Sequence, residues 1–142
     1  MNTTQKEIGK VLIVEDDPTN IFLAEILLKN EFEIHSVTNG HDAIKAVDEK
    51  EFDVVLMDIN LGDEGMDGIR TMRIIKQKRR HRYLKIFAIT AYSDAEQWFL
   101  KEGFDEFFMK PVNDKVTNAI RETLIKKSSG DRVSKNRMAV CA

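Results

Sequence analysis

The chain has 142 residues, a length that suits one domain with a buried core. Its 22 Lys and Arg residues face 24 Asp and Glu residues, and the net charge of −2 excludes a polycationic footprint spread over the whole chain. The only cysteine, Cys141, has no intramolecular partner, which excludes a disulfide framework and favours a reducing, cytoplasmic location. The polar residues 1–10 lack the apolar stretch of a secretion signal, and no apolar run approaches the roughly 20 residues of a membrane span.

Short apolar runs alternate with helical patterns along the chain. The predicted strands are 11–15, 34–37, 53–58, 85–90 and 106–109. The predicted helices run from Pro18 to about Asn30, from Ala43 to about Lys50, from Ile69 to Ile75, from a cap at Ser93 or Asp94 to Gly103, and from Val112 to about Lys127. This alternation predicts an α/β fold, a doubly wound five-stranded parallel sheet with helices on both faces. Residues 10–127 are expected to form the domain, between a polar segment 1–9 and a polar, aperiodic tail 128–142.

Polar residues stand at the ends of four of the predicted strands. Glu15 and Asp16 end the first, Asp58 ends the third, Thr90 ends the fourth, and Lys110 follows the fifth. In an open α/β sheet the ligand crevice lies beyond the carboxyl ends of the strands, so we expect these side chains to converge. Phosphoryl transfer to a carboxylate needs a nucleophilic oxygen, a divalent cation, a positive charge and a small hydrogen-bond donor.

The roles follow from residue chemistry. Asp58 is the expected nucleophile because it ends the central strand, and an Asp needs no general base at neutral pH. Glu15 and Asp16 offer the hard oxygen ligands that Mg²⁺ prefers. Carboxylates crowded at one edge repel each other and raise one another's pKa.

Each residue also has an ordinary structural explanation. An Asp at a strand end is often a turn or cap residue, and the acids at 15–17 could be the solvated start of a helix. Thr90 is an ordinary strand residue, and a Lys-Pro pair is common in loops. The occurrence of all of them at the carboxyl ends of predicted strands favours the phosphate-handling site.

The pattern resembles the receiver domain of bacterial two-component response regulators over roughly residues 10–127. The motifs that carry the resemblance are V-E-D-D (14–17), L-M-D-I-N (56–60), M-D-G (66–68), I-T-A (89–91) and F-F-M-K-P (107–111). The resemblance implies a flavodoxin-like, CheY-like fold. It also implies that Asp58 accepts a phosphoryl group from a sensor histidine kinase or a histidine phosphotransfer protein.

The same resemblance implies the ligands of the cation. Asp16 and Asp58 would bind Mg²⁺ or Mn²⁺ directly, and the backbone carbonyl of Asn60 would complete the protein's share. Glu15 would act through water, and Asp17 would only flank the site.

The resemblance further implies a phosphate clamp and a switch. Lys110 would pair with a phosphoryl oxygen, aimed by a cis bond to Pro111. Thr90 would donate its hydroxyl hydrogen bond to another phosphoryl oxygen. On moving toward that oxygen, Thr90 would leave a space, and Phe107 would move into it. Many relatives carry Tyr at the position of Phe107, so the switch is expected to be one of packing.

The expected protein is a single-domain phosphoacceptor switch, not a conventional enzyme beyond its own phosphoryl transfer and autodephosphorylation. Its output surface would be formed by the fourth helix, the strand 106–109 and the last helix. A protein effector would bind this surface, and the protein could also form a homodimer. A DNA-binding output domain is not expected, because only fifteen residues follow Lys127. Met1 and the short tail favour a complete protein mildly.

Alternatives remain. The opening at 14–20 also resembles receiver modules of hybrid histidine kinases or phosphorelays. A Mg²⁺-dependent phosphohydrolase with an Asp nucleophile is less favoured, because Pro18 stands two residues after Asp16 where that family has a second Asp. A nucleotide-binding module lacks the glycine-rich loop that it would need.

Four other features are distinctive. The loop after Asp58 looks longer than usual. Its Asp63 and Glu64 could cap the next helix or could slow the attack of an anionic phosphodonor, and capping is favoured. The basic run 76–85 is interpreted as the solvated end of a helix, with an acidic partner or nucleic acid as the minor alternative. The three histidines share no ligand spacing and are expected on the surface. Of the adjacent aromatic residues Trp98 and Phe99, one is expected to be exposed.

Overall fold

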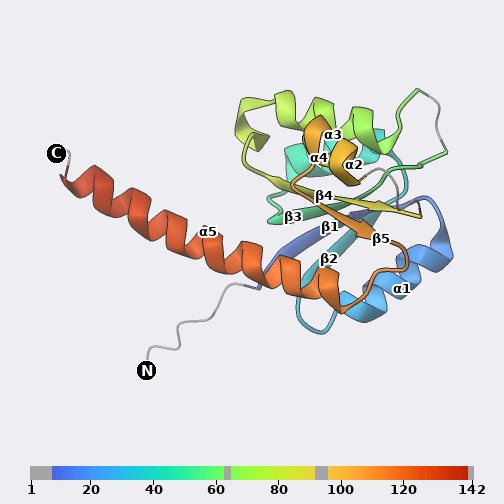
Figure 1. The fold of residues 1–142 in the computed structure, drawn as a ribbon, viewed down its shortest axis with the longest axis horizontal. Helices are drawn as coiled ribbons and strands as arrows, with labels where there is room; N and C mark the ends of the chain where they lie inside the picture. The colour runs from blue at the N-terminus through green and yellow to red at the C-terminus, as the bar shows by residue number, and fades with distance from the viewer. Residues whose placement is uncertain (1–7, 63–64, 92–95, 141–142) are drawn as a thin grey trace.

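The computed structural model describes residues 8–62, 65–91 and 96–140, which form one parallel sheet with helices on both faces (Figure 1). The strands are β1 (Lys10–Val14), β2 (Glu33–Val37), β3 (Val54–Asp58), β4 (Lys85–Thr90) and β5 (Glu106–Met109). All four pairings are parallel and the strand order is β2-β1-β3-β4-β5. The predicted doubly wound, flavodoxin-like sheet is confirmed.

Five helices cover the sheet. They are α1 (Pro18–Leu28), α2 (Gly40–Glu49), α3 (Gly68–Gln77), α4 (Glu96–Glu102) and α5 (Asp114–Val140), and a short 3₁₀ turn, η1 (Arg79–His81), follows α3. Figure 1 shows α1 and α5 on one face, and α2, α3 and α4 on the other. Side chains alternate along β1, so Leu12 packs toward α2 and α3 while Val11 packs toward α1 and α5. The central strands are thus buried on both faces, which explains their unbroken apolar runs.

Capping residues fix where the helices begin and end. Asp17 caps α1 by accepting a hydrogen bond from the backbone N–H of Thr19 at 2.8 Å, which is the flanking role expected of it. Asp67 caps α3 in the same way, so the start of α3 does not depend on Asp63 or Glu64, which lie outside the described residues. The expected caps of α4, Ser93 and Asp94, also lie outside them. Gly103, with φ of +124°, ends α4 as predicted.

The last helix is longer than the sequence pattern predicted. The expected end near Lys127 is wrong, because α5 continues to Val140 and projects past the sheet (Figure 1). Helical periodicity in a sequence marks a stripe buried against a neighbouring element, and the projecting part of α5 has no sheet beside it. The segment 128–140 contains no proline, but only Arg132, Lys135, Arg137, Met138 and Ala139 are strong helix formers, so its composition did not indicate a helix. Within the described part of the chain, no helix carries an apolar stretch long enough to cross a membrane.

His81 contradicts the prediction that the histidines lie on the surface. Its side chain is buried, and its Nε2 lies 3.0 Å from Oδ1 of Asp48. Asp48 also pairs with Nζ of Lys78 at 2.5 Å, and these two hydrogen bonds hold the pKa of Asp48 below its ordinary value. The partner lies 33 residues earlier, so no local pattern could reveal this contact.

Candidate functional site

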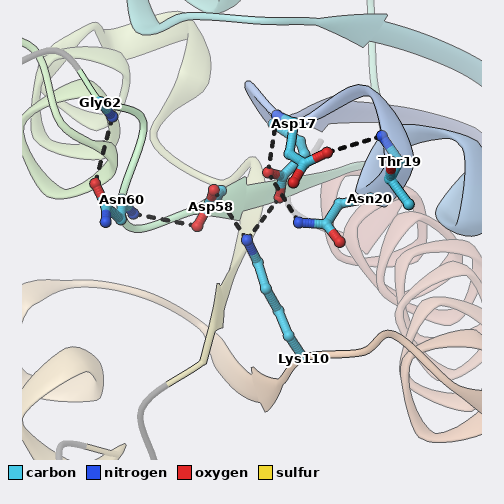
Figure 2. Close-up of polar contacts among 8 residues, drawn as sticks. Asp17, Thr19, Asn20, Asp58, Asn60, Gly62 and Lys110 are labelled. Atoms are coloured by element: carbon cyan, nitrogen blue, oxygen red, sulfur yellow. Dashed lines mark hydrogen bonds and ion pairs between the residues drawn. The ribbon is translucent and has the colours of Figure 1, made fainter.

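Four strands deliver polar side chains to one edge of the sheet. Asp58 is the last residue of β3, which lies between β1 and β4, while Glu15 and Asp16 follow β1. Carboxylate oxygens of these three residues lie within 4.8 Å of one another. Lys110 follows β5 and extends its ammonium group between Asp58 and Glu15 (Figure 2). The convergence expected from the strand ends is therefore present in the structure.

Lys110 links two of the carboxylates. Its Nζ lies 2.9 Å from Oε2 of Glu15 and 3.1 Å from Oδ2 of Asp58. Burial alone would lower the pKa of the Lys110 ammonium, but the hydrogen bonds and charges of Glu15 and Asp58 outweigh burial and raise it. The Lys110-Pro111 bond is cis, as the resemblance implied, and the backbone N–H of Lys110 donates to the carbonyl of Thr90 at 2.7 Å. Lys110 is thus a permanent positive charge in the site.

Asp58 is a buried carboxylate with an incompletely satisfied oxygen. Its Oδ1 accepts a hydrogen bond from the backbone N–H of Asn60 at 3.1 Å. Its Oδ2 is buried and receives no well-directed hydrogen bond, although Nζ of Lys110 lies nearby. Burial, and then the charge of Glu15, raise the pKa of Asp58 to about 6 against the opposing effect of Lys110. The expected carboxylate repulsion is present, but burial is the larger cause.

Glu15 and Asp16 are neighbours with different surroundings. Glu15 is buried, and its Oε1 accepts hydrogen bonds from the backbone N–H of Asp17 at 3.2 Å and from the amide of Asn20 at 3.4 Å (Figure 2). Since Oε2 pairs with Lys110, both oxygens of Glu15 have protein partners. Asp16 is exposed, and among the described residues its carboxylate has no hydrogen bond or ion pair. Asp16 is therefore the carboxylate left available for an external ligand.

The donor set fits a hard divalent cation. Oδ2 of Asp58 receives no well-directed hydrogen bond, the carboxylate of Asp16 is available, and oxygens of the cluster lie within 4.8 Å of one another. Mg²⁺ binds such sites through one or two carboxylates and retains several waters. The engagement of Glu15 by protein groups agrees with its expected contact through water.

Glycines allow the loops to approach this carboxylate cluster closely. The backbone N–H of Gly68 donates to the carbonyl of Ile59 at 3.1 Å, and a Cβ on Gly68 would lie only 2.2 Å from the carbonyl oxygen of Asp58. Gly62 has φ of +71°, and a Cβ there would lie 3.0 Å from Oδ2 of Asp16. The glycine in the M-D-G motif therefore lets α3 pack directly against the end of β3.

Thr90 and Phe107 share one face of the sheet. Phe107 pairs with Ala88 across β4 and β5, and both pack in the cluster under α2, α3 and α4. Thr90 is two residues beyond Ala88, so its buried side chain points to the same face. The ring of Phe107 stacks on Phe99 of α4, with centroids 5.6 Å apart and planes 15° apart. Phe107 therefore connects β5 to α4 by packing, on the face of the sheet to which Thr90 points.

The remaining aromatic residues divide between core and surface. Phe108 points to the opposite face, where its ring lies 5.6 Å from that of Phe87. Phe99 is 5% exposed and Trp98 is 46% exposed, as expected for adjacent residues of one helix.

The outer face of α1 carries an apolar surface next to the site. Phe22, Leu23 and Ile26 are 60%, 47% and 45% exposed. A small cleft of about 30 Å³ lies beside them, lined by Leu23 together with Asp58 and Lys110. A helix that is apolar on all sides is normally buried, so the outer face of α1 is a candidate contact surface.

Sequence reasoning missed Asn20. Its side chain reaches the Oε1 of Glu15 from the first turn of α1, so it helps to orient one of the site carboxylates. The only signal was its place within the V-E-D-D-P-T-N opening, to which no role had been attached.

Comparison with known proteins places this geometry in a family. The sequence pattern of the response regulator receiver domain matches residues 11–121. The chain therefore belongs to the response regulator receiver domain family, whose members act as phosphoacceptor switches in two-component signalling.

Individual relatives are of several kinds. The sensor protein GacS of Pseudomonas syringae is 33% identical over 110 residues, which cover 75% of this chain and 12% of that protein. The transcriptional regulatory protein ZraR of Salmonella typhimurium is 33% identical over 119 residues, which cover 82% of this chain and 25% of that protein. This chain thus spans a quarter or less of the length of these relatives.

A solved structure agrees in fold. The receiver domain of sensor histidine kinase PA1611 from Pseudomonas aeruginosa has a TM-score of 0.72 and 25% identity, with 82% of this chain and 97% of that chain covered. That structure has a magnesium ion coordinated in its active site cleft. The acidic cluster of Glu15, Asp16 and Asp58 is consistent with such a site.

Proposed function

We propose that Asp58 accepts a phosphoryl group from a phosphohistidine and that the phosphorylated domain signals by changing a protein-binding surface. The observation that supports this most strongly is the setting of Asp58. Its buried Oδ2 receives no well-directed hydrogen bond, lies 3.1 Å from the Lys110 ammonium and is close to two further carboxylates. Such a group has high free energy as an anion, so a partner that completes its coordination is strongly favoured.

The transfer step uses groups already in place. An oxygen of Asp58 forms a bond to phosphorus, the bond from phosphorus to the donor imidazole nitrogen breaks, and that nitrogen keeps the bonding electron pair. Because the pKa of Asp58 is about 6, the carboxylate is mostly ionised at neutral pH and needs no general base. Nζ of Lys110 compensates the charge on a phosphoryl oxygen, and the hydroxyl of Thr90 donates to another.

A divalent cation is the proposed cofactor. Asp16 and Asp58 would hold Mg²⁺ or Mn²⁺ directly, the carbonyl of Asn60 would complete the protein ligands, and Glu15 would act through water. When bound, the cation supplies positive charge that offsets the negative charge of the phosphoryl oxygens.

The exposed face of α1 is the proposed docking surface for the phosphodonor. Phe22, Leu23 and Ile26 provide apolar area, and Leu23 also lines the cleft that contains Asp58. A partner helix packed on this face would bring a histidine to the mouth of the cleft. A sensor histidine kinase or a histidine phosphotransfer protein fits this requirement.

The output surface is proposed to lie on α4, β5 and α5. Phe107 of β5 stacks on Phe99 of α4, so a shift of Phe107 would move α4 directly. On α4 and β5, Trp98 and Met109 are 46% and 45% exposed, which gives a protein effector apolar contacts. Phosphorylation would act by changing the relative populations of two packings of this surface.

The chain could work as a single-domain regulator or as a module of a hybrid kinase or phosphorelay. Its similarity to the sensor protein GacS favours a module of a hybrid kinase. The transcriptional regulatory protein ZraR has the same sequence identity, 33%, and favours a receiver of a regulator. The chemistry at Asp58 is the same in both. Transfer onward to a histidine phosphotransfer protein would identify a relay, since a terminal switch retains its phosphoryl group until hydrolysis.

The decisive experiment is to map the phosphoryl group. The protein is incubated with acetyl phosphate and Mg²⁺, and the acyl phosphate is located by mass spectrometry after hydride reduction. We expect labelling at Asp58, none in Asp58→Asn, and undiminished labelling in Asp17→Asn. Asp17 is a suitable control because it caps α1 beside the site, and Asn caps a helix as well as Asp. Stable labelling at another residue in Asp58→Asn would overturn the proposal.

A further inference from the structure

The positive charge of this chain is concentrated in two segments. Residues 76–85 and 126–137 hold eleven of the 22 Lys and Arg residues but only one of the 24 acidic residues. The first segment contains the end of α3, η1 and the start of β4, and the second lies on α5. A net charge of −2 therefore conceals a strongly polarised molecule.

Much of this charge is not neutralised locally. Lys76 and Lys78 end in ion pairs with acids of neighbouring elements. By contrast, four exposed cations of the described part of these two segments have no hydrogen bond or ion pair from their side chains: Arg79, Arg80, Arg82 and Lys126. Lys50, which precedes β3, is exposed and unpaired in the same way. The interpretation of residues 76–85 as the solvated end of α3 does not explain why Arg80 lies beside Lys50 and Lys126, which belong to other segments.

Three of these cations line one groove, and Arg79 and Arg82 are the chain neighbours of its lining residues Arg80, His81 and Tyr83. It has a volume of about 1020 Å³ and lies at the amino-terminal edge of the sheet, between the turn before β3, the segment before β4 and α5. Lys50, Arg80 and Lys126 each line it from one of those three segments. Cations brought together from distant parts of the chain are held by the fold itself, which distinguishes this groove from an isolated basic run.

Aromatic groups complete the groove. Phe52 and Phe87 contribute to its lining, and Tyr83 stands on its edge with 84% of its surface exposed. An exposed aromatic ring beside basic residues is the arrangement on which unpaired bases stack, and Tyr83 directly follows Arg82 in the chain.

Acidic residues also line the groove and limit what it can bind. Asp53 and Asp105 are already paired with lysines, at 2.7 Å from Lys127 and 2.6 Å from Lys76. Glu51 and Glu106 have no such pairing within the described residues. Their negative charge makes the groove less suited to the dense charge of a duplex than to a single strand.

We infer that this groove binds single-stranded nucleic acid, with Arg79, Arg80 and Arg82 on the phosphates and Tyr83 stacked on a base. The guanidinium groups suit phosphate oxygens through paired hydrogen bonds. The groove lies at the opposite edge of the sheet from Asp58, so the two sites do not compete for space. The inference therefore stands independently of the phosphoacceptor function.

The test is fluorescence anisotropy with a labelled single-stranded RNA of about 12 nucleotides, titrated with the full chain between about 50 and about 200 mM salt. The combined change Arg79→Ala, Arg80→Ala and Arg82→Ala should lower affinity at least about tenfold at the lower salt. It should also reduce the slope of log K against log salt by about 2, because each phosphate contact on a single strand contributes roughly 0.7.

The matched control removes the same charge elsewhere. Lys29, Lys45 and Lys115 are exposed, have no side-chain ion pair within the described residues, and lie outside the groove. Changing all three to Ala should alter affinity less than about twofold, since none would contact a phosphate. An equal loss in the control would show that only net charge attracts the RNA, and would overturn the inference.

Tyr83 separates stacking from charge. Tyr83→Ala should weaken binding by about 5- to 100-fold with an unchanged salt slope, and Tyr83→Phe should restore it, because a phenyl ring stacks as well. Three results would each refute a nucleic-acid groove. The first is that Tyr83→Phe fails to restore binding, and the second is that no RNA binds at about 50 mM salt. The third is that a poly-glutamate peptide of equal charge binds more tightly than the RNA. The last result would assign the groove to an acidic protein segment. The far-UV circular dichroism spectrum and the melting temperature of each variant show whether it is folded.

Discussion

The substitution Asp58→Asn should stabilise the protein in the absence of divalent cations, and the gain should grow with pH. The folded-state pKa of Asp58 is raised to about 6, so the native state binds a proton more tightly than the unfolded chain does. The stability that this proton contributes is fully present below the unfolded pKa and is lost as pH rises through about 6. The neutral amide of the variant does not titrate in this range and therefore escapes the loss.

The size of the effect follows from the shift. A rise from 3.8 to about 6 is worth at most about 3 kcal/mol, at roughly 1.36 kcal/mol per pKa unit. The cleft opens to solvent, which screens part of this energy, and the variant leaves Lys110 with a single carboxylate partner. We therefore expect a net gain of roughly 1–2 kcal/mol at pH 7.5, or about 3–8 °C in melting temperature.

The assay is thermal and urea unfolding of the parent and the variant in EDTA at pH 4.5 and at pH 7.5. At pH 4.5 the native Asp58 is largely protonated. The pH-dependent part of the stability difference between parent and variant should therefore fall to about a third of its value at pH 7.5. Asp17→Asn provides the control, because it changes an exposed carboxylate that the fold does not bury. Saturating Mg²⁺ should stabilise the parent and close the gap, since a ligand that binds only the native state raises its stability.

Two outcomes would refute this reasoning. A gain that is equal at the two pH values would show that the Asn side chain packs better, not that the carboxylate carries a burial cost. A variant less stable than the parent at pH 7.5 would show that the pairing with Lys110 outweighs the desolvation of Asp58.

Three further predictions follow from the site. Asp16→Ala should lower the affinity for Mg²⁺ at least about tenfold, because it removes a proposed ligand. Its thermal stability without metal should be kept or increased, because one of three crowded carboxylates is gone. Unchanged Mg²⁺ affinity by calorimetry would place the ion elsewhere. Thr90→Ala should still be phosphorylated at Asp58 by acetyl phosphate, but beryllium fluoride should no longer change amide hydrogen exchange across α4 and β5; a response like that of the parent would show that the switch bypasses Thr90. Phe22→Ser should slow transfer from a phosphorylated histidine donor at least about tenfold and leave labelling by acetyl phosphate unchanged. Ile125→Ser, which changes a similarly exposed residue of α5, should affect neither reaction. Equal effects of the two variants would disprove docking on α1.

The sheet and the convergence of the site could be predicted because both depend on local patterns. A strand buried on both faces is a short apolar run, and parallel strands present their carboxyl ends at one edge. The ends of β4 and β5 agree with the prediction to the residue, and the end of β1 differs by one residue. The grouping of polar side chains around Asp58 was therefore implied by their places at the ends of the predicted strands.

What could not be predicted depends on contacts between distant residues. The pairing of Lys110 with both Glu15 and Asp58 requires the end of β5 to reach across β4, and nothing local to residue 110 signals it. His81 was expected on the surface because its partner Asp48 belongs to another helix. The length of α5 was underestimated because a helix that extends beyond the sheet needs no periodic apolar stripe in its sequence.

The charge balance of the site bears on the proposed cation. With all three carboxylates ionised, Glu15, Asp16 and Asp58 carry three negative charges against the single positive charge of Lys110. A phosphodonor is itself an anion, so it would approach this excess of two charges against Coulomb repulsion in a partly desolvated cleft. One divalent cation would bring the sum to zero, whereas a second lysine would pair with Asp58 and leave the nucleophile less reactive. Asp58 itself is mostly ionised at neutral pH. Under the proposed function the cation would therefore act by removing the repulsion that an anionic donor meets, and we expect phosphorylation to depend on metal.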